Sequence, residues 1–189
     1  MVGVHSGCPV LVNARHPIRD TSRPALAPAA PGSGVLLEKR ASAMLTGALE
    51  RLGAVGEIVP VSGYRSEAEQ REIWDSSMAE NGEDFTRKFV PAPGCREHQK
   101  GLAIDLALRA EDIDFIRPDF PYDGVCGRFR EIAPDYGFIE RYPAGKEDIT
   151  GIAAEPWHFR YVGRPHARLM RDMGLTLEEY VEFLRGYPY

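Results

Sequence analysis

Two short segments carry the residues whose types and spacing could do chemistry. In the first, His98 precedes Asp105 by seven residues. From Gly101 onward, bulky apolar residues alternate with small ones and with Asp105, which is the two-residue period of a strand. We expect the bulky face to pack on the core and the other face to leave room into which Asp105 points. Gly101 permits a close backbone approach, so that His98 can bend over the same face.

The second segment runs from Glu155 to Gly163. Its aromatic and β-branched residues predict a strand from Trp157. On a regular strand Glu155 and His158 would point to opposite faces. Pro156 makes a regular element at Glu155 unfavourable, so we expect a bend there that brings both side chains to one cavity.

Two histidines and one carboxylate leave an open coordination position, as catalytic zinc sites do. A nearby glutamate that is not a ligand can take the proton of the zinc-bound water, which suits hydrolysis of a peptide bond. Two alternatives remain: a zinc-stabilised binding module without catalysis, and a non-haem iron site. Glu155 favours the enzyme, because a pure binding site has no need of a non-ligand carboxylate.

The elements expected to position these residues form one α+β domain over residues 1–189. It has a small, mostly antiparallel sheet flanked by helices, with the zinc site on the sheet face. Strands are predicted at 8–13, 57–62, 100–108 and from Trp157, and a long surface connection at 20–34. Helices are predicted at 41–52, from Ser66 to about 82, between 123 and 136, after Gly163, and from Thr176. The helices from Ser66 and Thr176 each open with a capping-box pattern.

Composition excludes several classes of function. The net charge of -5 and the absence of a Lys/Arg run argue against nucleic acid as a partner. No window approaches the ~20 apolar residues of a membrane span. Cys8, Cys95 and Cys126 are scattered, which predicts free thiols and, without a signal-peptide pattern, a cytoplasmic protein. We interpret the remaining histidines as ordinary surface or loop residues: His5, His16 and His166. Nothing in the sequence predicts an oligomeric state.

Three motifs carry a family resemblance. HQKGLAID at 98–105 and EPWHFRYVG at 155–163 resemble the metal motifs of the zinc D,D-peptidases of the VanY/VanX group, and VanXY-type enzymes most of all. SGYRS at 62–66, with Gln70, matches that family's third motif. The resemblance spans nearly the whole chain. It implies removal of D-alanine from small D-Ala-D-Ala-terminated cell-wall peptides, as in vancomycin resistance, with one zinc ion per chain.

The resemblance also implies roles for single residues. His98, Asp105 and His158 match the zinc ligands, and Glu155 matches the catalytic base. Arg65 matches the arginine that steadies the substrate carbonyl as it becomes an oxyanion, just before a helix whose dipole adds positive potential.

The substrate contacts depart from the family pattern at two positions. Gln70 matches a substrate-contacting position, with a plain exposed helix residue as the alternative. Arg96 stands where the family usually has serine, and could pair with the terminal carboxylate of the substrate or simply be exposed. Ser62 stands where dipeptide-cleaving relatives often have aspartate, so it cannot pair with the ammonium of a free dipeptide. We therefore expect pentapeptide to be preferred over D-Ala-D-Ala.

Overall fold

The computed structural model describes residues 8–13, 15–18, 20, 22–89 and 96–186. A four-stranded antiparallel sheet forms its centre, in the order β3 (Ile58–Ser62), β4 (Ala103–Leu108), β6 (His158–Tyr161) and β5 (Phe138–Glu140). A second, two-stranded antiparallel sheet consists of β1 (Leu26–Pro28) and β2 (Leu36–Glu38).

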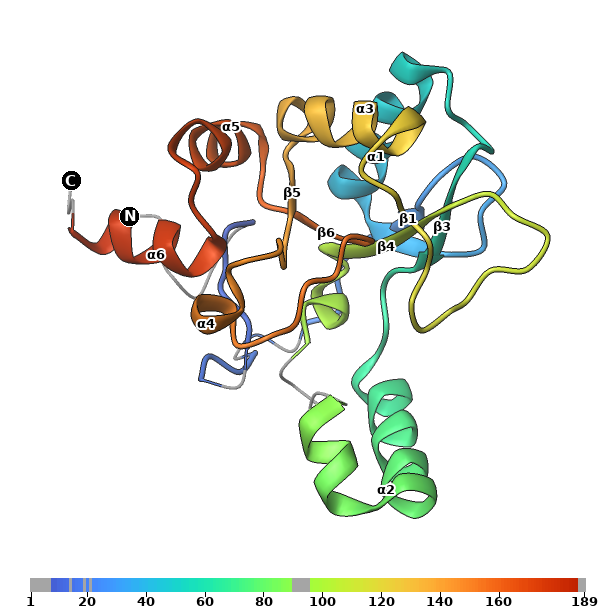
Figure 1. The fold of residues 1–189 in the computed structure, drawn as a ribbon, viewed down its shortest axis with the longest axis vertical. Helices are drawn as coiled ribbons and strands as arrows, with labels where there is room; N and C mark the ends of the chain where they lie inside the picture. Colours follow the sequence, from blue (N-terminus) through green and yellow to red (C-terminus); the bar gives the residue numbers. More distant parts are fainter. Residues whose placement is uncertain (1–7, 14, 19, 21, 90–95, 187–189) are drawn as a thin grey trace.

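Six α-helices and two 3-10 helices complete the described structure (Figure 1). The α-helices are α1 (Lys39–Leu52), α2 (Glu67–Phe89), α3 (Gly124–Ile132), α4 (Glu147–Thr150), α5 (Arg164–Met173) and α6 (Leu177–Gly186). The 3-10 helices are η1 (Glu97–Lys100) and η2 (Ala133–Tyr136). The predicted α+β class with a mostly antiparallel sheet is therefore confirmed, while the extent of one domain over 1–189 stays a prediction.

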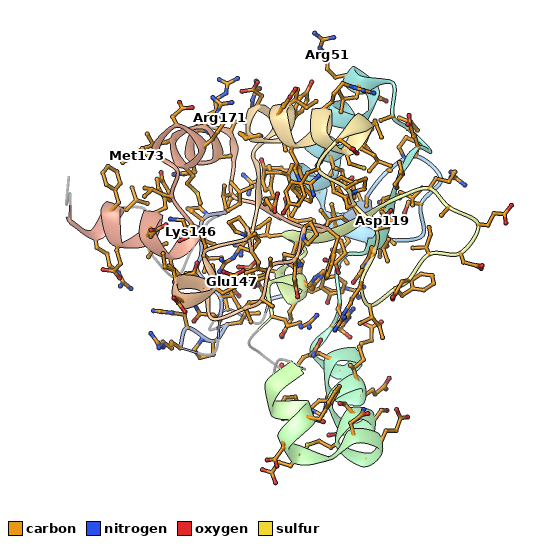
Figure 2. All side chains as sticks on the ribbon, viewed as in Figure 1. Arg51, Asp119, Lys146, Glu147, Arg171 and Met173 are labelled. Carbon is orange, nitrogen blue, oxygen red and sulfur yellow. The ribbon has the colours of Figure 1, made fainter. Side chains whose placement is uncertain are left out.

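The bulky face of β4 packs on the core, as its alternation predicts. Ile104 and Leu106 have no exposed surface and join Phe159 of β6 with residues of α1 and α3 in one cluster. Helices α1 and α3 lie together over this face (Figure 1). Figure 2 shows side chains filling the space between helices and sheet, while Arg51 and Arg171 extend outward from α1 and α5.

The register of the sheet lines up three residues that the sequence analysis selected. Asp105 lies opposite His158 of β6 and also opposite Ser62 of β3. The pairing with Ser62 depends on an irregularity between Pro60 and Ser62, at the edge strand where proline is tolerated. The three side chains therefore form a row across β3, β4 and β6.

Both predicted capping boxes are present. Ser66 N donates to Glu69 Oε2 at 2.7 Å, and Glu69 N donates back to Ser66 Oγ at 3.2 Å. Thr176 and Glu179 make the equivalent pair at 2.8 and 3.2 Å. Each pair satisfies backbone N–H groups that a helix start leaves unpaired, which fixes where α2 and α6 begin.

The strand predictions need three corrections. The run at 8–13 is no strand, since in the described part of the chain it forms a single bridge from Asn13 to His16. Its Leu11 packs instead against α5 and α6. The connection at 20–34 contains β1, which is too short to show a period. The third strand begins at Ala103 rather than 100, because Gly101 adopts φ 65° and ends η1 first.

Helix α2 was expected to end near Gly82. It turns there instead, at φ 81° and ψ 173°, and continues as a second helical segment. A bond of 2.8 Å between the hydroxyls of Ser77 and Thr86 joins the two segments. The resulting hairpin projects from the rest of the molecule (Figure 1). Ile73 of this arm is exposed, because the arm has little beside it to pack against.

Two further expectations concern the cysteines and the membrane. Among the described residues, Cys8 and Cys126 are free thiols, as predicted, and Cys95 lies outside the described residues. No described helix is both long and apolar enough to cross a membrane.

Candidate active site

Three predicted ligands from three elements converge on the face of the sheet where β4 carries small side chains. One donor atom from each of His98, Asp105 and His158 lies within 4.8 Å of the others. His158 Nδ1 is 2.8 Å from Asp105 Oδ1, and His98 Nε2 is 3.5 Å from Asp105 Oδ2. Because Asp105 and His158 are cross-strand partners, the sheet itself fixes their spacing.

His98 is oriented by the turn that follows it. Gly101 caps η1 in the left-handed region and donates from its N–H to His98 O at 3.0 Å. The His98 ring then donates from Nδ1 to the carbonyl of Gly63 at 2.7 Å, because a carbonyl oxygen can only accept. Its Nε2 is therefore the basic nitrogen. This atom is buried without a hydrogen bond among the described residues, as expected of a metal ligand.

The charges of this cluster suit a bound cation. Burial lowers the pKa of His98 to about 3, so the ring is neutral. Burial opposes ionisation of Asp105, yet the two histidines outweigh it and lower its pKa to about 2. Burial also disfavours a charged His158, but Asp105 and Glu97 outweigh it and raise the pKa to about 9. Without a metal, a proton on His158 thus supplies the positive charge that the carboxylates favour.

Glu155 lies beside this cluster, at the bend expected before β6. Its backbone N–H donates to Tyr142 O at 3.0 Å, and its carbonyl accepts from His158 N at 3.1 Å. Its Oε2 is 3.7 Å from His158 Nδ1. Burial raises the pKa of Glu155, which the charge of His158 partly offsets. A carboxyl with a raised pKa can both take up and release a proton.

Arg65 is held by the two neighbours that were expected to bind substrate. It donates from Nη1 to Gln70 Oε1 at 3.2 Å and from Nη2 to Ser62 Oγ at 3.0 Å. Its backbone N–H donates to His98 O, which joins this segment to η1. Gln70 is 2% exposed, so the alternative of a plain exposed helix residue is wrong.

Arg96 directly precedes η1 and is half-buried, which rules out a freely exposed arginine. Its Nε is buried and, among the described residues, has no hydrogen-bond partner. Burial and then the charge of Arg96 lower the pKa of Arg65, so the two guanidinium groups share one region. The site thus carries two positive charges beside the three predicted metal ligands.

A group of buried charges lies behind the ligands and was not predicted from the sequence. Glu97, Arg141 and Arg160 are each at most 3% exposed. Glu97 pairs with Arg141 at 2.8 Å and with Arg160 at 2.7 Å. Two signals in the sequence mark these residues. Glu97 directly precedes His98, and Arg160 lies two residues after His158 on the same buried strand. Tyr142 adds a ring whose centre is 5.1 Å from that of His158.

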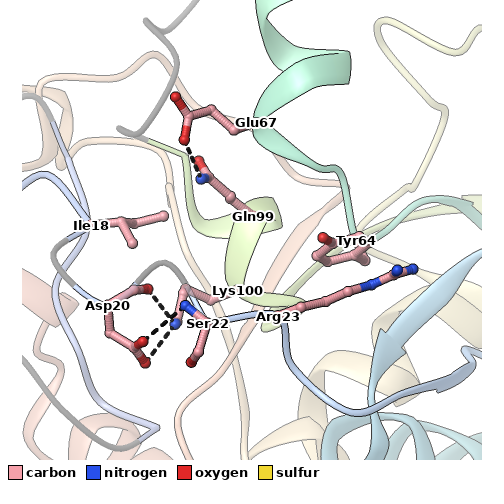
Figure 3. Close-up of a pocket in the computed structure, with 8 residues that line it drawn as sticks. All are labelled: Ile18, Asp20, Ser22, Arg23, Tyr64, Glu67, Gln99 and Lys100. Carbon is pink, nitrogen blue, oxygen red and sulfur yellow. Dashed lines mark hydrogen bonds and ion pairs between the residues drawn. The ribbon is translucent and has the colours of Figure 1, made fainter.

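A cavity of about 100 Å³ lies nearby, and Gln99 and Tyr64 in its lining adjoin residues of the site (Figure 3). Its polar groups already bind one another, since Lys100 pairs with Asp20 at 3.0 Å and Gln99 reaches Glu67 at 3.5 Å. None of the eight predicted site residues lines it. The cluster of His98, Asp105 and His158, and not this cavity, is therefore the candidate active site.

The other histidines have separate roles or lie elsewhere. His16 bonds within its own turn, to Asn13 at 3.0 Å. His166 is half-buried on α5 and bonds to the hydroxyl of Tyr180 on α6 at 2.7 Å, so it joins two helices and is no ordinary surface residue. His5 lies outside the described residues.

Known proteins are similar to this chain over most of its length. Residues 37–164 match the family VanY, D-alanyl-D-alanine carboxypeptidase. The bifunctional D-Ala-D-Ala dipeptidase and D-Ala-D-Ala carboxypeptidase VanXYC of Enterococcus gallinarum is 43% identical over 177 residues, 92% of this chain and 93% of the relative.

Two solved structures are similar as well. The vancomycin resistance D,D-dipeptidase VanXYg, in complex with a D-Ala-D-Ala phosphinate analog, is 52% identical with a TM-score of 0.90, covering 97% of this chain and 74% of that one. A mutant of the D,D-pentapeptidase VanY from a VanB-type resistance cassette, in complex with Zn(II), is 32% identical with a TM-score of 0.75, covering 92% and 98%. The chain therefore belongs to the VanY family of D-alanyl-D-alanine carboxypeptidases.

Proposed function

We propose that this protein is a zinc peptidase that hydrolyses the terminal D-Ala-D-Ala bond of cell-wall precursor pentapeptide, and also free D-Ala-D-Ala, as in glycopeptide resistance. The observation that carries the proposal is the convergence of three ligand atoms within 4.8 Å beside a carboxylate with a raised pKa. The dipeptidase and carboxypeptidase activities of the relative from Enterococcus gallinarum support it.

His98, Asp105 and His158 hold one zinc ion per chain, through His98 Nε2, an Asp105 oxygen and His158 Nδ1. A neutral histidine, an ionised aspartate and an open fourth position fit a catalytic zinc. A zinc ion bound there supplies a Lewis acid that lowers the pKa of a bound water to about 7. The Zn(II) complex of the VanY relative supports this choice of metal.

Glu155 moves the protons of the reaction. Its carboxylate accepts the proton that the attacking water loses, and the carboxyl then donates this proton to the nitrogen of the departing D-alanine. The raised pKa of Glu155 supports this role, because a strongly acidic group would hold the proton too weakly for the second step.

Arg65 stabilises the oxyanion that forms on the scissile carbonyl. Ser62 and Gln70 accept hydrogen bonds from its guanidinium and so fix its direction before substrate binds. A donor that needs no reorientation during the reaction contributes most to the rate. From their positions beside Arg65, Ser62 and Gln70 also contact the substrate.

Arg96 binds the terminal carboxylate of the substrate. Its half-buried side chain, with an unpaired Nε among the described residues, has donors to offer. Its charge also repels the ammonium of a free dipeptide, and Ser62 provides no carboxylate to neutralise that ammonium. Pentapeptide, which has a neutral amide at this position, is therefore the preferred substrate.

The test measures the terminal alanine, of either configuration, that purified, zinc-loaded protein releases from pentapeptide precursor or from D-Ala-D-Ala. Glu155→Gln protein and a pentapeptide ending in L-alanine are the controls. Only wild-type protein is expected to release alanine, and only from the substrates that end in D-alanine. If pentapeptide binds but no D-alanine appears, the protein is a binding module. Metal analysis of protein purified without added metal distinguishes zinc from iron.

A cytoplasmic location is part of the proposal. The free thiols of Cys8 and Cys126 support a reducing compartment. Fractionation of cells that express the protein, followed by immunoblotting, tests it.

A further inference from the structure

Glu97 is a buried carboxylate beside the three proposed metal ligands, and it has no part in the reaction as proposed. Its side chain is 2% exposed. Oε1 accepts a hydrogen bond from Arg141 Nε at 2.8 Å, and Arg160 Nη1 makes an ion pair with the same oxygen at 2.7 Å, although outside hydrogen-bond angles. Two guanidinium groups therefore fix the direction of the carboxylate.

These two arginines are themselves anchored to distant parts of the chain. Arg141 binds Glu178 of α6 through its two terminal nitrogens, at 2.8 and 2.6 Å. Arg160 donates to the carbonyls of Cys8 and Val10, at 3.0 and 2.7 Å. Because both arginines are held, Oε1 cannot turn away from them, and Oε2 must point in the opposite direction.

The second oxygen of Glu97 faces His158. Oε2 lies 3.8 Å from His158 Nε2, and both atoms are buried without a hydrogen bond to any described residue. Unpaired buried polar atoms are rare in proteins. Here the two unpaired atoms face each other, an acceptor and a ring nitrogen that can carry a proton, so a small closing movement satisfies both.

The other histidine of the cluster shows the same arrangement in completed form. His98 directs Nδ1 to the Gly63 carbonyl at 2.7 Å and leaves Nε2 for the cluster. His158 is turned the other way, with Nδ1 facing Asp105 at 2.8 Å and Glu155 at 3.7 Å. In each ring, the nitrogen away from the cluster faces an oxygen.

We propose that Glu97 is a positioning residue that accepts a hydrogen bond from His158 Nε2–H and so holds His158 in the tautomer whose Nδ1 binds the metal. Such an outer partner fixes both the proton and the ring orientation of a metal-binding histidine. This inference rests on the proposed function, because it takes His158 as a ligand.

The variant Glu97→Gln gives a directional test. Both arginines can only donate, so the amide oxygen of glutamine must face them. Its NH₂ group then points at His158 Nε2 and favours the tautomer with the proton on Nδ1, which cannot bind metal. Loss of an outer partner typically weakens metal affinity 10–100-fold, so zinc is expected to bind about 10–100-fold more weakly.

Glu140→Gln is the control, since it changes a second carboxylate that pairs with an arginine, here Arg130 at 2.9 Å, at a side chain that is 16% exposed. Zinc affinity, measured by competition with a chromophoric chelator, is expected to stay at the wild-type level in this variant. Wild-type affinity in Glu97→Gln overturns the proposal, even if that variant is less stable.

A measurement on zinc-loaded wild-type protein decides the matter if Glu97→Gln does not fold. With ¹⁵N-labelled histidine, NMR of the imidazole nitrogens is expected to show the His158 proton on Nε2 and the metal on Nδ1. A proton on Nδ1 overturns the proposal. His158→Ala separates the two levels: if it keeps full zinc, the proposed ligand set fails, whereas if it loses zinc and Glu97→Gln does not, only the role of Glu97 fails.

Discussion

Gly101→Ala is expected to damage both the stability and the metal site, and the structure allows the size of the effect to be worked out. Gly101 has φ 65°, a region that costs an L-residue about 1–2 kcal/mol. An added Cβ would lie 2.8 Å from the backbone nitrogen of Glu38. To relieve this contact, the turn must move away from β2, which weakens the 2.8 Å bond from Glu38 N to Gly101 O.

Gly174→Ala is the matched control. Gly174 ends α5 at φ 66°, with nothing within 4 Å of an added Cβ. Both variants therefore carry the same backbone strain. Gly101→Ala carries in addition a lost hydrogen bond of about 1 kcal/mol and overpacking of about 1–3 kcal/mol. The difference of about 2–4 kcal/mol corresponds to a Tm about 4–16 °C lower than that of the control.

Thermal unfolding followed by circular dichroism, together with zinc affinity, measures both effects. Because Gly101 also holds His98 through its N–H, Gly101→Ala is expected to bind zinc more weakly while Gly174→Ala binds it normally. Equal Tm values for the two variants would show that the turn has room to spare. The account of how η1 is positioned would then be refuted.

The remaining predictions concern single side chains. Glu155→Gln is expected to keep zinc and fold while losing ~10²–10⁴-fold in rate, and a variant without zinc would make Glu155 a ligand. Arg65→Ala should lower kcat by roughly 10²–10³-fold, and a change in KM alone would make Arg65 a simple binding residue. Ser62→Asp should raise kcat/KM for D-Ala-D-Ala relative to pentapeptide, and an unchanged ratio contradicts our account of the preference. Burial lowers the pKa of His166, so the unfolded chain takes up its proton first as pH falls below about 6.5 and stability drops; His166→Gln should show a smaller loss of Tm between about pH 7.5 and about pH 5.5, and an equal loss would refute this.

The parts of the site that follow local rules were predictable from the sequence. The alternation around Asp105 predicted which face of β4 packs on the hydrophobic core, and the capping boxes predicted where α2 and α6 begin. The three-residue strands β1, β2 and β5 were missed, because a strand of that length shows no period and is defined by its partner. The run at 8–13 failed for the converse reason, since apolar residues can be buried against helices as well as in a sheet.

The pairing of the buried charges could not be predicted from the signals that mark these residues, because it depends on partners far away in sequence. Glu97 is separated from Arg141 by 44 residues, and only the fold shows that its charge is compensated. Gln70 is a similar case. On a helix near its start, a glutamine is usually solvated, but the first turn of α2 faces the body of the protein and buries it.

The pairing of Asp105 with His158 has a consequence for how the chain matures. The two residues are 53 positions apart, and they meet only when β4 and β6 have docked in the correct register. A slip of one residue would turn His158 to the other face and bring Phe159 toward the ligands. Zinc uptake during refolding should therefore follow chain collapse and occur only in molecules whose strands are correctly paired. The fraction of protein that holds zinc then measures how much of it has the correct strand register.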